Sequence, residues 1–174
     1  MVHLNQQELN EKYEALDGIG FIQWLTDGYL AAVGGALTAE NMDVLSDAQH
    51  AVLCYRYLLD EVMEGGFIQL IQNGYAPYVL DGPFPMVVKK EWGTLVGDGE
   101  KVMRDFSKLL YEAKKEWHRH EDAFDADMSD EDFMALYEQL EELNELGDDF
   151  LDDHQEVVTP LVAQMVMNNI NMYA

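Results

Sequence analysis

Two pairs of side chains in the sequence have the types and the spacing that catalysis or metal binding requires. Cys54 follows His50 by four residues, a separation that brings a thiol and a base together on a helix. Glu116 and His120 have the same separation and could share a cation, but the sequence offers no third ligand. Cys54 also falls on the apolar stripe of its helix, where a buried thiol is common. We therefore predict that neither pair is a catalytic or metal site.

A third group, Asp125, Asp127 and Ser129, has the spacing with which a calcium-binding loop begins. The sixth position of such a loop is glycine and the twelfth is glutamate, whereas this chain has Asp130 and Leu136 there. The loop therefore lacks both its turn residue and its bidentate ligand. We predict no metal site, no cofactor and no catalytic residue in this protein.

Four glutamates have a spacing that serves charge display rather than catalysis. Glu138, Glu141, Glu142 and Glu145 lie at positions i, i+3, i+4 and i+7, which share one face if Asp130–Leu146 forms a single helix. No lysine or arginine alternates with them, and each like-charged pair costs about 0.2–0.5 kcal/mol in an exposed helix. Helix stability alone does not favour this pattern.

The whole chain is strongly acidic. Its 174 residues contain 34 Asp and Glu but only 10 Lys and Arg, so the formal net charge is −24. Such a charge argues against binding nucleic acid or an anionic membrane, and it leaves basic proteins, cations or solubility alone as what the charge could serve. Sixteen of the acids lie between Glu121 and Glu156, where no lysine or arginine occurs. Within this segment we predict that the partner-binding residues are Asp130, Glu131, Glu138, Glu141, Glu142, Glu145, Asp148, Asp149, Asp152 and Asp153.

The local signals predict an all-α protein. Ser46 and Gln49 have the form of a capping box, and the apolar residues that follow them recur at helical spacing. Ser129 and Asp132 are a weaker start signal, and Gly147 is the expected end of the helix that follows. We expect about seven or eight helices in one compact domain.

We expect this domain to span residues 1–174, with an acidic segment at 121–156 and an apolar C-terminal helix at 157–172. That last helix is apolar on most sides, which favours either the core or a dimer interface. The polar start of the chain, with Glu8 and Glu11, does not have the form of a signal peptide, and the single Cys54 cannot form an internal disulfide. A cytoplasmic protein is therefore expected.

A glycine-containing string at residues 64–74, EGGFIQLIQNG, is the most distinctive motif. Gly65 and Gly66 permit a tight turn between helices, and Phe67 is expected to enter the core. Gln69 and Asn73 are expected to satisfy backbone groups at the bend. The string resembles the GGF-x-Q…N signature of the nineteen-kilodalton DNA-mimic-protein family, a bacterial domain family otherwise of unknown function.

This resemblance implies an all-α fold and allows a homodimer. It also implies that the surface carboxylates imitate duplex phosphates and occupy a transcription factor or another basic DNA-binding protein, without any chemistry. Two other hypotheses stay open. The chain could be a helical adaptor that binds through apolar surface such as residues 157–174, with the acids serving solubility. It could also be an enzyme that uses an unrecognised carboxylate or histidine pair.

Overall fold

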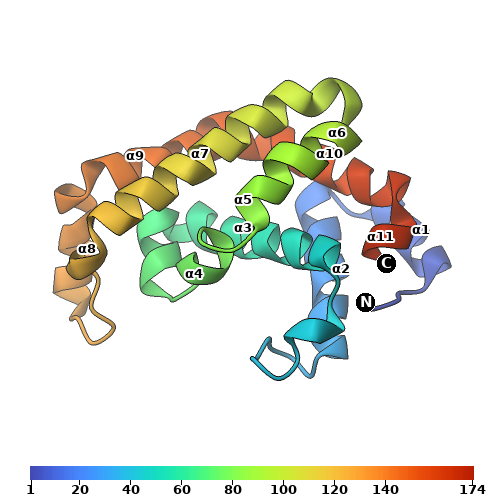
Figure 1. Cartoon of the computed structure of the whole chain (residues 1–174), viewed down its shortest axis with the longest axis horizontal. Coiled ribbons are helices and arrows are strands. Elements are labelled where there is room, and N and C mark those ends of the chain that lie inside the picture. The colour runs from blue at the N-terminus through green and yellow to red at the C-terminus, as the bar shows by residue number, and fades with distance from the viewer.

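The computed structural model describes residues 1–174, and all of its regular elements are helical, which confirms the all-α prediction. Figure 1 shows α3 (Asp47–Gln72) in the middle of the molecule, with α7 (Glu100–Arg119) above it in this view and α2 (Gly18–Ala32) packed at the N-terminal end of α3. Of the eleven α-helices, four have only three or four residues, which leaves seven of substantial length. The other helices are α1 (Gln6–Ala15), α4 (Ala76–Val79), α5 (Phe84–Val87), α6 (Gly93–Leu95), α8 (Asp130–Gln139), α9 (Glu141–Asp149), α10 (Gln155–Asn168) and α11 (Ile170–Tyr173).

Short helical turns join several of these helices. Two are π turns, Val88–Trp92 between α5 and α6 and Phe150–His154 between α9 and α10. Three are 3₁₀ turns, at Met42–Val44, Gly97–Gly99 and Glu121–Ala123. The four prolines include three within residues 77–85, where the chain breaks into the short helices α4 and α5.

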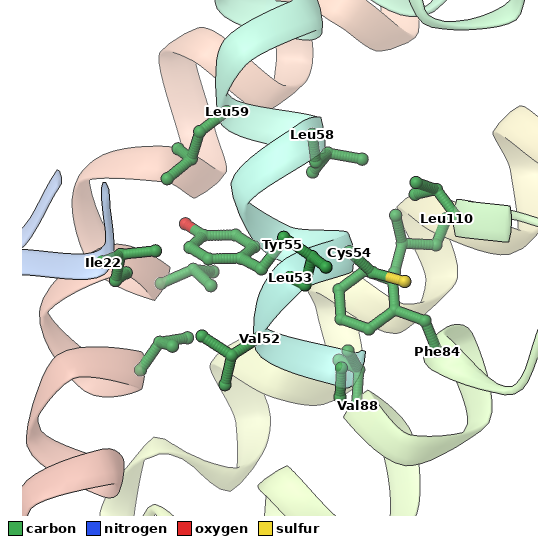
Figure 2. Close-up of a cluster of buried hydrophobic side chains, with 14 of the residues drawn as sticks. Ile22, Val52, Leu53, Cys54, Tyr55, Leu58, Leu59, Phe84, Val88 and Leu110 are labelled. Carbon is green, nitrogen blue, oxygen red and sulfur yellow. The ribbon is translucent and has the colours of Figure 1, made fainter. Parts of the chain in front are cut away.

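A single hydrophobic cluster of 41 buried residues holds the helices together. Figure 2 shows that α3 passes through it and directs side chains to more than one side. Tyr55 lies on the side of Ile22 from α2, whereas Cys54 lies on the side of Phe84 and Leu110. One connected core indicates that the helices stabilise one another as one unit.

The start of α3 follows the capping box that the sequence predicts. The Ser46 hydroxyl accepts a hydrogen bond from the backbone N–H of Gln49, and the Gln49 side chain accepts one from the backbone N–H of Ser46. Ser129 likewise caps α8 by accepting from the N–H of Asp132. These contacts satisfy donors that the first turn of a helix leaves without partners.

Gln49 has a second role that its capping motif does not reveal. Its buried side chain accepts a hydrogen bond from the Val2 N–H at 3.0 Å and donates to the Val2 carbonyl at 2.7 Å. It also donates to the carbonyl of Tyr173 at 3.2 Å. One side chain therefore joins the two ends of the chain, which lie close together in Figure 1.

The prediction of one helix over Asp130–Leu146 is wrong. The helix breaks at Leu140, whose φ of −113° and ψ of 58° are not helical, so α8 and α9 have different directions. Leu140 is buried, and beyond the break α9 packs against α3 with Leu143 buried. Burial of Leu140 and Leu143 therefore outweighs the tendency of this sequence to form one continuous helix. Breaking the helix costs little electrostatically, because it removes like-charge neighbours rather than favourable ion pairs.

The prediction that Gly147 ends a helix is also wrong. Gly147 is buried inside α9, and the chain continues through the π turn into α10. A Cβ at position 147 would lie 3.0 Å from the Cα of Gly66, so glycine here permits two helices to approach closely. The C-terminal apolar stretch forms α10, which begins at Gln155, and α11, which follows a break at Asn169.

Candidate protein-binding surface

All ten carboxylates that the sequence selects are exposed. The structure distributes them over two helices and one turn rather than one helix. Asp130, Glu131 and Glu138 lie on α8, whereas Asp152 and Asp153 lie in the π turn. The remaining five lie on α9: Glu141, Glu142, Glu145, Asp148 and Asp149. Glu138 is therefore separated by the Leu140 break from the glutamates whose face it was expected to share.

The α9 acids extend into a longer array. Helical backbone angles persist at Phe150 and Gln155, so α9, the π turn and α10 form one rod with a local distortion at His154, whose φ is −116°. Along this rod the acids recur at three- to four-residue intervals, which places them on one side, opposite the buried Leu143 and Phe150. We call this array the acidic stripe: Glu141, Glu142, Glu145, Asp148, Asp149, Asp152, Asp153 and Glu156.

Glu156 is a member of this stripe that the sequence alone did not select. It is exposed and lies four residues after Asp152, in the first turn of α10. Its spacing would have indicated it if the helix had been expected to continue beyond Gly147. Of the other eight carboxylates of the segment, four lie on α8, beside the stripe rather than in line with it, and four lie between α7 and α8.

The charge density of the stripe lies between that of one DNA strand and that of the duplex. From Glu141 to Glu156 the rod is about 22 Å long at a rise of ~1.5 Å per residue. Eight carboxylates over that length give roughly one charge per 2.8 Å, whereas DNA carries one per ~1.7 Å of duplex and one per ~3.4 Å of a single strand. The stripe therefore presents slightly more charge per unit length than one DNA strand.

Little positive charge offsets the stripe. Of its eight acids only Glu142 forms an ion pair, with Arg119 at 3.7 Å, and Arg119 lies closer to the buried Glu116 at 2.6 Å. His154 is half-buried beside the stripe, and this burial lowers the pKa of its imidazole although Asp153 and Asp149 act in the opposite direction. Burial therefore favours the neutral form of His154, which does not offset the charge of the stripe.

The glycine signature forms the part of α3 against which α9 packs. Gly65 and Gly66 break the helical geometry of α3, with φ 68° and ψ −172° at Gly66, and Phe67 is buried as expected. The Tyr137 hydroxyl of α8 donates to the carbonyl of Gly65 at 2.6 Å, while Gly147 of α9 lies against Gly66. The kink therefore contacts both acidic helices and orients the stripe.

The role expected for Gln69 and Asn73 needs correction. Their amides do not bind backbone groups at the bend. Gln69 Nε2 and Asn73 Nδ2 both donate to Oε2 of Glu61, at 2.9 and 2.8 Å. Glu61 lies before the kink and the amides lie after it, so this carboxylate joins the two halves of α3. A side chain twelve residues away cannot be identified as the partner from local spacing.

The other candidate groups have structural partners. His50 bonds to the Tyr78 hydroxyl and to the carbonyl of Met42, whereas the buried Cys54 thiol donates to the Tyr78 carbonyl. Burial raises the pKa of Cys54, so its reactive thiolate form is disfavoured. No group of three or more His, Cys, Asp or Glu side chains has an arrangement that could hold a metal ion. None of the helices has both the length and the apolar character of a membrane span.

His118 of α7 contacts Asp81, which lies in the connection between α4 and α5. Its Nε2 lies 2.6 Å from Asp81, and its Nδ1 bonds to Glu121. Hydrogen bonds to Asp81 and then to Glu121 raise the pKa of His118 above its usual value. The protonated imidazole can donate from both ring nitrogens, which is why these carboxylates favour it.

We expect the contribution of His118 to stability to depend on pH. A raised folded-state pKa gives stability that is complete below the unfolded value of about 6.5 and is lost as the pH rises through the folded value. At about pH 5.5 the wild type should have a higher free energy of unfolding than His118→Gln, and by about pH 9 this difference should have disappeared. The difference should be less than about 1 kcal/mol, because the site is exposed to solvent. Urea denaturation of both proteins across this range measures the difference, and a flat difference would contradict the prediction.

Comparison with known proteins supports the resemblance inferred from the glycine signature. The family described as "DMP19-like protein" matches residues 43–169, a range that includes α3, the kink and the whole acidic stripe. The chain is also 27% identical over 137 residues to the protein named DNA mimic protein DMP19 of Neisseria meningitidis serogroup B (strain ATCC BAA-335 / MC58). That alignment covers 78% of this chain and 76% of the relative. This chain belongs to the DMP19-like protein family.

Proposed function

We propose that this protein is a DNA mimic whose acidic stripe occupies the basic, DNA-contacting surface of a DNA-binding protein. The observation that carries the proposal is the line of eight exposed carboxylates, almost free of cations, at a spacing close to that of DNA phosphates. The similarity to DNA mimic protein DMP19 supports the same function. On this proposal the carboxylates replace phosphates and the protein performs no chemistry. The partner class on this proposal is a basic DNA-binding protein, such as a transcription factor.

If the partner binds through the stripe, removing carboxylates from the stripe should weaken binding. The triple variant Glu145→Gln, Asp149→Asn and Asp152→Asn removes three exposed charges and relieves like-charge repulsion, so it is expected to fold. A matched control, Glu8→Gln, Glu11→Gln and Glu14→Gln, removes three exposed acids from α1. We expect the stripe variant to bind its partner about tenfold more weakly and with a smaller dependence on salt, whereas the control binds as the wild type does.

The measurement is affinity capture from a lysate of the native host, with elution by salt and by duplex DNA. A DNA mimic should retain a basic DNA-binding protein that both moderate salt and DNA release, and the stripe variant should retain much less of it. Equal retention of the partner by the wild type, the stripe variant and the α1 control would show that the stripe is not part of the binding surface. A partner that resists both salt and DNA would favour the adaptor hypothesis.

The structure leaves part of the apolar surface of residues 157–174 for that alternative, since Val157 and Met172 are exposed, but most of the large apolar side chains of α10 are buried. Val158, Val162, Met165 and Val166 of α10 are all buried within the core. Their burial explains why this segment is apolar on most sides without a partner. The burial of most of these apolar side chains therefore favours the stripe, rather than the helix at 157–172, as the partner-binding surface.

A further inference from the structure

A cavity of about 340 Å³ lies away from the acidic stripe, where the beginning of α3 meets the Met42–Val44 turn and α5. Its apolar wall includes Leu45, Ala51 and Phe84, and the polar members of its lining are few. The volume is within the usual range for ligand pockets, which is roughly 300–1,000 Å³. The complete lining consists of Met42, Asp43, Leu45, Asp47, His50, Ala51, Cys54, Pro83, Phe84 and Val87.

The polar groups in the wall already have partners within the protein. His50 Nε2 donates to the Met42 carbonyl at 2.9 Å, because a carbonyl oxygen can only accept. His50 Nδ1 then accepts from the Tyr78 hydroxyl at 2.6 Å, and the Cys54 thiol donates to the Tyr78 carbonyl. Apart from the carboxylates of Asp43 and Asp47, no lining side chain is left to fix the orientation of a polar ligand, so the interior of the cavity fits an apolar group.

The rim of the cavity is negative and partly apolar. Asp43 and Asp47 are exposed, and neither forms an ion pair. Val44 and Met86, which are sequence neighbours of lining residues, each expose 41% of their surface. An occupant that buries an apolar group here and places a cation beside the two aspartates would complement both features.

We propose that this cavity is a docking site for a basic protein segment that inserts a large apolar side chain next to a lysine or arginine. A second copy of this chain is disfavoured as the occupant, because two chains of net charge −24 would meet at an already negative rim. The site is a second contact surface, on α3 and α5, and it does not depend on the acidic stripe of α9. It supplies specificity for apolar groups, which a surface of carboxylates cannot provide.

The test uses three acetylated tripeptide amides as probes, followed by NMR of the full-length protein. The sequence Lys-Phe-Lys is expected to shift the resonances of Leu45, Ala51 and Val87. Lys-Ala-Lys should bind about tenfold more weakly, since it buries far less apolar surface, and Glu-Phe-Glu should not bind.

Two variants connect the shifts to the cavity. Asp43→Asn with Asp47→Asn keeps the shape but removes the rim charge, so binding of Lys-Phe-Lys should fall severalfold. Val87→Trp, at a half-buried lining position, should fill the cavity and abolish binding. The stripe variant Glu145→Gln, Asp149→Asn and Asp152→Asn should bind the peptide normally, which separates this proposal from the DNA-mimic function.

Three results would overturn the proposal. The first is that Lys-Phe-Lys leaves the lining resonances unshifted. The second is equal binding of Lys-Phe-Lys and Glu-Phe-Glu, which would show that the rim charge has no role. The third is a concentration-dependent shift of the same resonances without peptide, which would identify a second copy of the chain as the occupant.

Discussion

Gly66→Ala is expected to lower the free energy of unfolding by about 2 kcal/mol, a cost typical of a side chain forced into a backbone region that only glycine populates readily. Gly66 has φ 68° and ψ −172°, and these angles create the kink of α3. A Cβ on Gly66 would meet no neighbouring atom, so the cost arises from backbone strain rather than from a clash. Urea denaturation followed by far-ultraviolet circular dichroism measures the change.

Gly93→Ala is the matched control for this substitution. Gly93 has helical angles, and a Cβ there would make only ordinary contacts, the nearest at 3.8 Å. The same chemical change should therefore leave the protein as stable as the wild type or stabilise it by about 0.4–1 kcal/mol. If both variants unfold at the same urea concentration, the kink is not strained for alanine and its assigned role is wrong.

The consequence of Gly66→Ala extends to the acidic surface. Gly147 of α9 lies against Gly66, and Tyr137 of α8 bonds to Gly65, so relaxation of the kink would displace the helices that carry the carboxylates. Partner capture by a folded Gly66→Ala protein should therefore weaken, even though no charge is removed. Weaker capture would indicate that the glycine signature contributes to partner binding by orienting the stripe.

Gln49→Leu is expected to destabilise the protein by about 3 kcal/mol, because buried backbone groups lose their partners. The substitution removes the capping-box contact to the N–H of Ser46 and the hydrogen bonds to Val2 and Tyr173. The leucine side chain has a similar size but cannot donate or accept hydrogen bonds. Both ends of the chain should consequently exchange their amide hydrogens faster.

Gln7→Leu is the appropriate control for Gln49→Leu. Gln7 is exposed on α1, and its side chain bonds only to the neighbouring Glu11. We expect this control to change stability by no more than about 0.5 kcal/mol. Denaturation curves of the two variants should therefore differ widely. Similar curves would show that the buried hydrogen bonds of Gln49 contribute little.

The sequence by itself determined the features that depend on neighbouring residues. Ser46 and Gln49 identify the start of α3 because a capping box is complete within four residues. The all-α class follows from helical apolar spacing, and the kink at Gly65 and Gly66 follows from the lack of a side chain. Composition alone also indicated an acidic surface, since sixteen acids without a basic residue cannot all be buried.

The tertiary structure alone decided how those acids are arranged. Leu140 interrupts the expected helix because its burial and the contact of α9 with α3 outweigh local periodicity. Gly147 continues a helix because Gly66, far away in the sequence, leaves room for nothing larger. Glu61 binds Gln69 and Asn73 only because the kink folds α3 back toward it. Each of these outcomes depends on contacts between distant residues, whose free energy no local pattern contains.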